Sequence, residues 1–493
     1  MAGPEPAAPR YRLGPRSTRG LIAGWRTGQI ACVALGLLLA VGFLRSVGGA
    51  AGALLALGAA GGGVAVATWP VAGRTLEQWA PTVTGFGVRT SAEARWQPWH
   101  LSNGRPRGPL SRLAVLALPE PWDQEPAWRD GLETLAGRLR VGRVVDEGTR
   151  PPLASTGIGV IGDAASSTWS AVLPVGGTGF ALLGEAERAE RIAAWSGVLA
   201  TMARDTAGLH RLQWLSSSYP AWLGGALPGG GSGLPGAHYG RLLEEASANL
   251  WAHEVHVAVS VRRGGAGRLS PPDPAVLLRE QLSALDERLR GAGLVPGPAL
   301  SPLSLASFVR RSFDVTPLVL PSPWPWPMGV HDGWSRLRTD ASWHATYWIA
   351  EWPRCEVGGG FLLPMLLEPG LRRVVSMTLA PLRALTAVRR AERERTEGTA
   401  DAEMRQRHGF AVTARAVREQ ESRQQQEVEL ADGHAGYRYS GYVTVTEADQ
   451  DELERACGRL EQSAALAQLE LRRLYGAQEE GYCCTLPAGR GCR

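Results

Sequence analysis

The strongest hydrophobic pattern in the chain lies near its N-terminus. Residues 27–44 and 46–73 carry no charged side chain and are separated only by Arg45. A bilayer core takes about 20 helical residues, so 27–44 and roughly 50–71 could each cross it, with a short turn between. The pattern predicts a two-helix transmembrane hairpin within 27–73. A cleaved signal peptide is the alternative for the first segment, but a long basic stretch precedes it and a second apolar segment follows at once.

Glycines and arginines around these segments add two expectations. Gly48 with Gly52, and Gly58 with Gly62, form G-x-x-x-G spacings that would let helix backbones approach closely in lipid, although glycine is frequent throughout this chain. Arginines occur in the tail 1–26 and again after the second segment, so the positive-inside rule places both termini in the cytoplasm. We therefore expect a two-pass protein of the cytoplasmic membrane.

Strand and helix patterns return after a membrane-proximal segment, 74–156. In a first unit, 157–315, strands are predicted at 157–162, 168–175, 209–217 and 252–261, with helices at 185–204 and after Asp273-Pro274. A Pro/Trp-rich linker, 316–330, follows. In a second unit, 331–493, strands are predicted at 342–352, 371–380, 435–446 and 467–474, with helices near 359–367 and 447–465.

The predicted fold class is α+β, with the N-terminal hairpin followed by two ferredoxin-like βαββαβ units on the cytoplasmic side. The second unit carries a helical arm, 382–430, inserted between two of its strands. The arm is dominated by Arg, Glu and Gln. It is either a solvated helical pair or a protruding element that docks a partner, because a polar helix with a thin apolar seam needs a surface to lie against.

Composition narrows the function further. The chain contains no lysine, so all 52 of its Lys and Arg residues are arginines. This excludes the lysine of a Walker A P-loop, the β3 lysine of a kinase and any Schiff-base lysine. The net charge of +5 arises from the arginine-bearing tail, while the rest of the chain is close to neutral. We therefore expect no direct nucleic-acid binding.

Candidate chemistry is sparse. Residues 157–162 match G-x-G-x-x-G, but a second strand follows them where a dinucleotide site needs a helix, which favours a hairpin. His253, Glu254 and His256 alternate across a strand and lack a third metal ligand. The adjacent Cys483 and Cys484 are interpreted as buried apolar residues. We predict no catalytic residue, no cofactor and no metal site, and hence a protein that is not an enzyme.

Several segments resemble membrane components of bacterial secretion systems. The run His331–Trp334, then 343–354 and 361–367, is similar to the conserved segment of EccE, a type VII secretion component with an N-terminal membrane hairpin. Three other features resemble an actinobacterial two-span integral membrane protein family of conjugative elements, encoded beside type IV secretion ATPases. They are the exit at 74–76, the Arg/Glu/Gln-rich helix before 437–446, and the endings 474–478 and 484–487.

The resemblance implies a membrane-anchored structural component of a conjugation or secretion apparatus. The expected partners are the lipid bilayer, a VirB4-like or FtsK-like ATPase, other membrane subunits and a second copy of the chain. An EccE-like type VII component is the first alternative, and a membrane-tethered enzyme or nucleotide-binding module is the second. The candidate contact residues lie on the Trp-rich strand and the arm: Trp343, Tyr347, Trp348, Trp352, Arg389, Arg393, Arg405 and Arg415.

Overall fold

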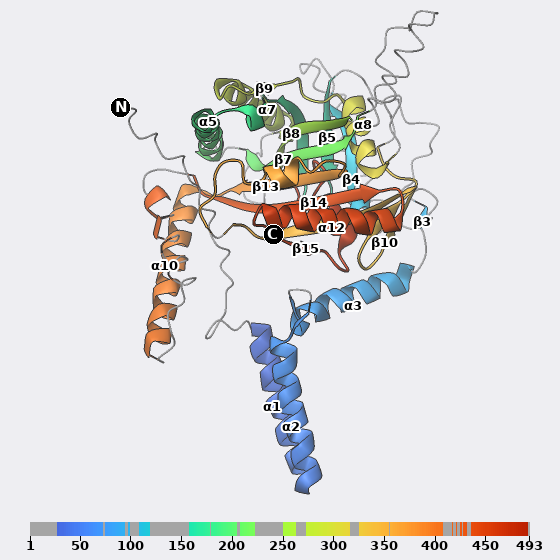
Figure 1. Ribbon diagram of the computed structural model, residues 1–493, viewed down its shortest axis with the longest axis vertical. Helices are drawn as coiled ribbons and strands as arrows, with labels where there is room; N and C mark the ends of the chain where they lie inside the picture. Colours follow the sequence, from blue (N-terminus) through green and yellow to red (C-terminus); the bar gives the residue numbers. More distant parts are fainter. Residues whose placement is uncertain are drawn as a thin grey trace, which may run out of the picture.

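The computed structural model describes most of the chain as one α+β body with an N-terminal pair of apolar helices (Figure 1). The described residues are 27–71, 74–93, 97–98, 108–118, 157–177, 179–204, 208–221, 250–262, 273–315, 325–353, 355–407, 417, 421, 424–425, 427–430 and 435–491. The predicted basic tail 1–26 lies outside them. So does most of the linker 316–330.

Two apolar helices, α1 (Thr27–Ser46) and α2 (Gly49–Thr68), form an antiparallel pair that protrudes from the body (Figure 1). Each has 20 residues, or about 30 Å of helix, which matches the bilayer core. Both helices are long and apolar enough to cross a membrane, and little of either is covered by the rest of the chain. The pair is compatible with a two-pass membrane protein.

The helix pair is held by small residues, and of the four glycines predicted to allow close approach only Gly52 contributes: a Cβ there would lie 3.2 Å from the Phe43 carbonyl. A Cβ at Gly36 would lie 2.9 Å from the Ala59 carbonyl, and one at Gly63 would lie 2.9 Å from the Cys32 carbonyl. These two glycines therefore set the close approach of the backbones. A Cβ at Gly58 or Gly62 would meet no described atom within 4 Å, because these glycines lie on the side of α2 that faces away from α1.

A third helix, α3 (Leu76–Glu93), connects the pair to the body. It follows two short strands, β1 (Pro70–Val71) and β2 (Arg74–Thr75), and crosses the direction of the pair beneath the sheet (Figure 1). It packs against aromatic residues of the body through contacts described below. The sequence patterns did not predict this helix.

The body is built on one antiparallel sheet. Thirteen described strands belong to it, in the order β3-β10-β11-β12-β14-β13-β7-β8-β6-β5-β4, with β15 beside β12 and β9 beside β6. The strands are β3 (Gln97–Pro98), β4 (Leu113–Leu118), β5 (Ile158–Asp163), β6 (Thr168–Gly176), β7 (Leu209–Pro220), β8 (Trp251–Arg262), β9 (Val295–Pro296), β10 (Gly329–Asp332), β11 (Leu337–Thr339), β12 (Ser342–Glu351), β13 (Arg373–Pro381), β14 (Tyr437–Glu447) and β15 (Glu470–Arg473).

The two units expected from the sequence are not separate sheets. Strand β13 pairs with β7 from Arg373–Ser218 to Leu379–Leu212, so the edge strand of one half continues the sheet of the other. Strand β4, from the segment expected to be membrane-proximal, pairs with β5 and extends the same sheet. The structure is therefore a mixed α+β fold with an N-terminal apolar helix pair and a single large antiparallel sheet.

Helices cover both faces of the sheet, and alternation along the strands decides what each face buries. The remaining helices are α5 (Glu185–Arg204), α7 (Pro274–Gly291), α8 (Pro302–Phe313), α9 (Leu363–Leu366), α10 (Ala384–Arg407), α12 (Gln450–Leu466) and α13 (Gln478–Cys483), with single turns η1 (Leu110–Arg112) and η3 (Phe180–Leu182). Helices α5, α7, α9 and α12 cover the apolar face. Helix α8 and the C-terminal residues around α13 cover the opposite face.

Local signals explain why these helices begin where they do. The Asp273 carboxylate accepts a hydrogen bond from the Ala275 amide at 2.9 Å and is followed by Pro274, as the sequence predicted. Helix α7 then buries Leu278, Leu282 and Leu285 against β6 and β8. Helix α8 begins with the same signals, a Ser301 cap and a proline at its first position.

Candidate functional site

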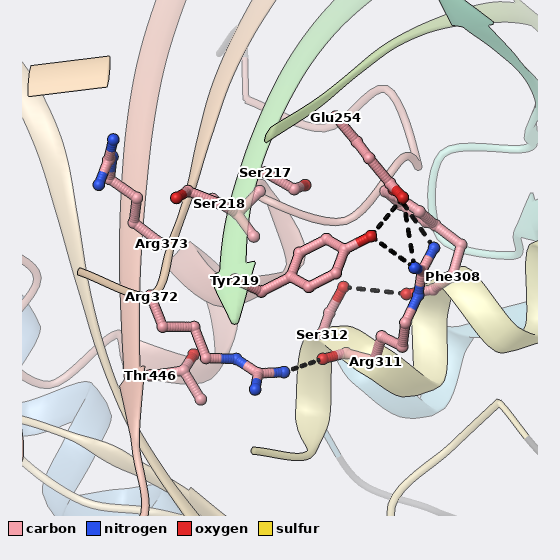
Figure 2. Close-up of a pocket in the computed structure, with 11 residues that line it drawn as sticks. Ser217, Ser218, Tyr219, Glu254, Phe308, Arg311, Ser312, Arg372, Arg373 and Thr446 are labelled. Carbon is pink, nitrogen blue, oxygen red and sulfur yellow. Dashed lines mark hydrogen bonds and ion pairs between the residues drawn. The ribbon is translucent and has the colours of Figure 1, made fainter. Parts of the chain in front are cut away.

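A small cavity lies at the seam between the two halves of the sheet, where β7, β8, β13 and β14 meet α8 (Figure 2). Its volume is about 30 Å³, which is room for about two water molecules. Most of the residues that line it are of polar type, including three arginines and one carboxylate. The lining residues are Ser217, Ser218, Tyr219, Glu254, Phe308, Arg311, Ser312, Arg372, Arg373, Val374 and Thr446.

Three of these side chains form a closed network. The Tyr219 hydroxyl donates to the Glu254 carboxylate and accepts a hydrogen bond from Arg311 at 2.6 Å (Figure 2). Arg311 also pairs with Glu254 at 3.3 Å and lies over the Tyr219 ring. Burial, followed by the neighbouring Glu254, raises the pKa of Tyr219, although Arg311 opposes the shift. The phenol is therefore a hydrogen-bond donor at neutral pH and not a nucleophile.

The other two arginines are committed to backbone carbonyls. Arg372 donates to the carbonyl oxygens of Arg311, Asp314 and Val315, where its charge meets the carbonyl end of α8. Arg373 is buried and donates to the carbonyls of residues 366, 368 and 371. Burial lowers the pKa of Arg373 to about 10, so it remains charged. Because each guanidinium has these partners, the arginines around the cavity stabilise the seam and do not present a free cationic site.

Of the candidate residues on β8, Glu254 belongs to this network, His256 lies beside it, and His253 is exposed. Burial lowers the pKa of His256 to about 4, so its ring is neutral, and it packs 4.5 Å from the Phe308 ring. Its Nε2 lies 4.0 Å from a Glu254 oxygen, and that carboxylate is already bonded to Tyr219 and Arg311. No three His, Cys, Asp or Glu side chains converge as metal ligands within the described part of the chain.

The glycine motif at 157–162 forms strand β5, and β6 follows it as the antiparallel partner. Gly159 is required for packing: its amide donates to the Leu300 carbonyl, and a Cβ there would lie 2.8 Å from the Ser301 carbonyl. The prediction of a hairpin is confirmed. Cys483 and Cys484 are buried, as expected from the sequence.

A second polar arrangement is a strap formed by residues 484–491, which crosses the polar face of the sheet at the seam. Gln213 donates to the carbonyls of Cys484 and Leu486 and accepts from the Gly489 amide at 2.8 Å. Thr378 donates to the Arg490 carbonyl at 2.6 Å. Since Gln213 lies on β7 and Thr378 on β13, the strap ties the two halves together.

The strap ends in an ion pair that reaches the far part of the sheet. Arg490 forms two hydrogen bonds of 2.8 Å with Asp163 at the end of β5. Burial acts to raise the pKa of Asp163, but the hydrogen bond and charge of Arg490, with Ser166 and the Ala165 amide, outweigh it and lower the pKa. The carboxylate is therefore ionised and paired inside the protein.

The predicted contact residues on β12, and Trp352 directly after it, divide into two groups. Tyr347 and Trp352 are buried among the residues under α12, and the Tyr347 hydroxyl donates to Glu461 at 2.8 Å. They serve the core in this fold, because alternation along β12 turns Tyr347 inward. Trp343 is half-buried, with Arg336 and Arg338 on its ring at 5.5 and 5.1 Å, and Trp348 is half-buried on the opposite face of the strand.

The arm expected at 382–430 begins as helix α10, which projects from the end of β13 towards the side of the body that carries the apolar helices α1 and α2 (Figure 1). Arg389 and Arg393 are exposed on it. Arg405 lies in α10 with its side chain outside the described part, and Arg415 lies outside the described residues. Arg395 bonds both oxygens of Glu427 at 2.9 Å, so the chain returns along α10.

Comparison with known proteins adds no family to this picture. No protein-family model matches the chain, and no curated protein sequence matches it significantly.

Proposed function

We propose that the protein is a membrane-anchored, non-enzymatic structural component of a bacterial conjugation or secretion apparatus in the cytoplasmic membrane. It docks a cytoplasmic ATPase or channel subunit, of the VirB4-like or FtsK-like kind, onto the membrane. The observation that carries the proposal is the position of the arm: a long polar insertion leaves the sheet on the same side as the apolar helix pair (Figure 1).

The arm is an addition to the sheet and not a part of its support. The Leu382 amide donates to the Gly436 carbonyl at 2.8 Å, and Pro381 is paired with Tyr437, so β13 and β14 would form an ordinary hairpin without it. Among the described side chains of the arm, the buried ones are Ala387 and Ala391, which lie at its base. A polar element that the fold does not need for its own packing is suited to binding another protein.

The remaining features are consistent with a scaffold. The cavity at the seam has room for about two water molecules, and its tyrosine, glutamate and arginines bond one another or the backbone. The strap and the buried pair Asp163–Arg490 hold the two halves as one plate. A rigid plate fixed to the bilayer keeps a docked partner at a constant orientation.

We also infer that each half of the plate is a ferredoxin-like unit. Numbered along the chain, the strands of both halves lie in the order fourth, first, third, second: β9-β6-β8-β7 and β15-β12-β14-β13. In each half, helices follow the first and third strands, as in the βαββαβ pattern. The two units are joined through their second strands, β7 and β13.

Excision of the arm tests the docking role. Replacing residues 383–435 with an Asn-Gly turn should preserve the sheet, because Leu382 and Gly436 are already neighbours. In native membranes, this variant should insert and unfold like the full chain but lose the proteins that crosslink to it. The charge reversals Arg389→Glu and Arg393→Glu should weaken the same crosslinks, whereas Arg455→Glu on the exposed side of α12 should not. Unchanged crosslinking after excision would remove the arm from the proposal.

A further inference from the structure

Helix α3 leaves an apolar face uncovered beside the membrane helices. Leu76, Ala80 and Val83 are exposed at helical spacing along one side, and Val83 is 51% exposed. Pro81 and Thr84 are exposed next to them. No charged residue lies between positions 78 and 88. Leu76, Ala80 and Val83 therefore form a continuous apolar strip along about two turns of helix.

The other side of α3 is fixed to the body by aromatic contacts. The Trp79 ring lies 5.6 Å from Trp334 and 5.8 Å from Tyr475, and Phe86 meets Trp334 edge-on at 5.2 Å. Gly476 closes this contact at a positive φ of 68°, where a Cβ would lie 2.7 Å from the Trp334 ring. The body therefore determines which face of α3 is turned away from it.

The uncovered strip is continuous with the membrane helices. The Glu77 carboxylate, in the first turn of α3, lies against Gly28 at the start of α1. Gln29 of α1 donates to the Ala67 carbonyl at the end of α2 at 2.7 Å, so both helix ends and α3 lie at one level. At this level α3 runs across the direction of the pair, between it and the sheet (Figure 1).

We propose that α3 lies in the interfacial layer of the bilayer, with Leu76, Ala80 and Val83 against lipid and the aromatic contacts against the body. A helix with one apolar face and no charge on that face is stabilised at the boundary between headgroups and acyl chains. The inference rests on the proposed membrane anchor and specifies how the plate is held. The hairpin holds the plate at the membrane, and α3 determines the distance of the plate from the bilayer and its tilt.

Cysteine accessibility tests the proposal in proteoliposomes of the full chain. Val83→Cys is compared with Val276→Cys on α7, because the two valines are 51% and 50% exposed in the protein. Labelling by a charged, membrane-impermeant maleimide is read peptide by peptide, so that the native cysteines do not interfere. Leu38→Cys, in the middle of α1, reports on the hairpin. Val83→Cys should react at least about tenfold more slowly than Val276→Cys, because lipid excludes the reagent and disfavours the thiolate.

The outcomes separate the two claims. Equal rates at Val83→Cys and Val276→Cys, with Leu38→Cys protected, would overturn the interfacial helix and leave the anchor intact. Rapid labelling of Leu38→Cys would overturn the anchor itself. Protection of Val83→Cys that disappears when the protein is diluted in lipid would also overturn the proposal, because a second copy and not the bilayer would then cover the strip.

Discussion

Removal of Arg490 is the sharpest perturbation of the strap. In Arg490→Ala, the Asp163 side chain, only 2% exposed, loses both of its 2.8 Å charge-assisted hydrogen bonds. Breaking a buried pair from one side costs about 3–5 kcal/mol of unfolding free energy. Asp163 keeps its bonds to the Ala165 amide and the Ser166 hydroxyl, so we expect the lower end, about 3 kcal/mol. In a body of this size, that corresponds to a fall in melting temperature of roughly 4–5 °C.

The assay is thermal unfolding of the purified full chain in detergent, followed by tryptophan fluorescence. Arg290→Ala is the matched control, since Arg290 makes the same two-pronged bond to Asp286, at 2.9 and 3.1 Å, on the surface. Solvent screens that pair, so its loss should leave the melting temperature unchanged.

The dependence of this destabilisation on pH shows whether the unpaired Asp163 carboxylate causes it. In the native protein the pKa of Asp163 is lowered from 3.8, so its stabilising contribution is present above that value and is lost as the pH falls through the lowered pKa. Without Arg490, burial would raise the pKa of Asp163 instead, and protonation would relieve the penalty. The difference between Arg490→Ala and the native chain should therefore shrink between pH 7 and about pH 4.5. The reasoning would be refuted if Arg490→Ala lowered the melting temperature no more than Arg290→Ala does, or if the decrease were independent of pH.

Three further predictions follow from other contacts. Gly36→Leu should lower the amount of folded protein in membranes, because the new side chain would meet the Ala59 carbonyl. Gly58→Leu should not lower it, because a Cβ at Gly58 would have no described atom within 4 Å. Fluorescence-detected size exclusion measures the amount of folded protein for both variants. Tyr219→Phe should cost about 1 kcal/mol of unfolding free energy, since one hydrogen-bonding hydroxyl is lost and Arg311 keeps its pair with Glu254; a loss of membrane insertion would contradict a role confined to the seam. Burial, and then the charge of Glu452, raises the pKa of Glu447 from 4.5 to about 7. The contribution of this carboxyl group to the free energy of unfolding is therefore fully present below pH 4.5 and is lost as the pH rises through about 7. Glu447→Gln should thus raise the melting temperature at pH 8 and leave it unchanged at pH 4.5, and an equal gain at both would contradict the assignment.

Local signals were sufficient for the helices and strands that bury one regular face. The helix at 185–204 and the cap at Asp273 were predicted as they occur. The same signals, Ser301 followed by Pro302, mark the start of α8, which the sequence patterns did not predict. Helix α3 had no such signal, because Pro81 and the glycines and threonines of this helix have low helix propensity. Its aromatic contacts with the body supply the stabilisation that propensity does not.

The single sheet and the strap could not be predicted from local patterns. Ser376 and Thr378 alternate with Val375 and Met377, which predicts a strand with one face in water. In the fold this polar face is covered, because the strap supplies carbonyl partners from residues more than a hundred positions away. The seam network likewise joins β7, β8 and α8, and pairing of the edge strands β7 and β13 depends on tertiary contacts that no local spacing records.

Purification of the tagged full chain from its native membrane in mild detergent, with mass spectrometry of the proteins recovered, tests the central claim most directly. The account predicts recovery of a VirB4-like or FtsK-like ATPase together with other membrane subunits, with the ATPase lost from the arm-excised variant. Recovery of the chain alone, with crosslinking in intact membranes also yielding no partner, would contradict a docking scaffold.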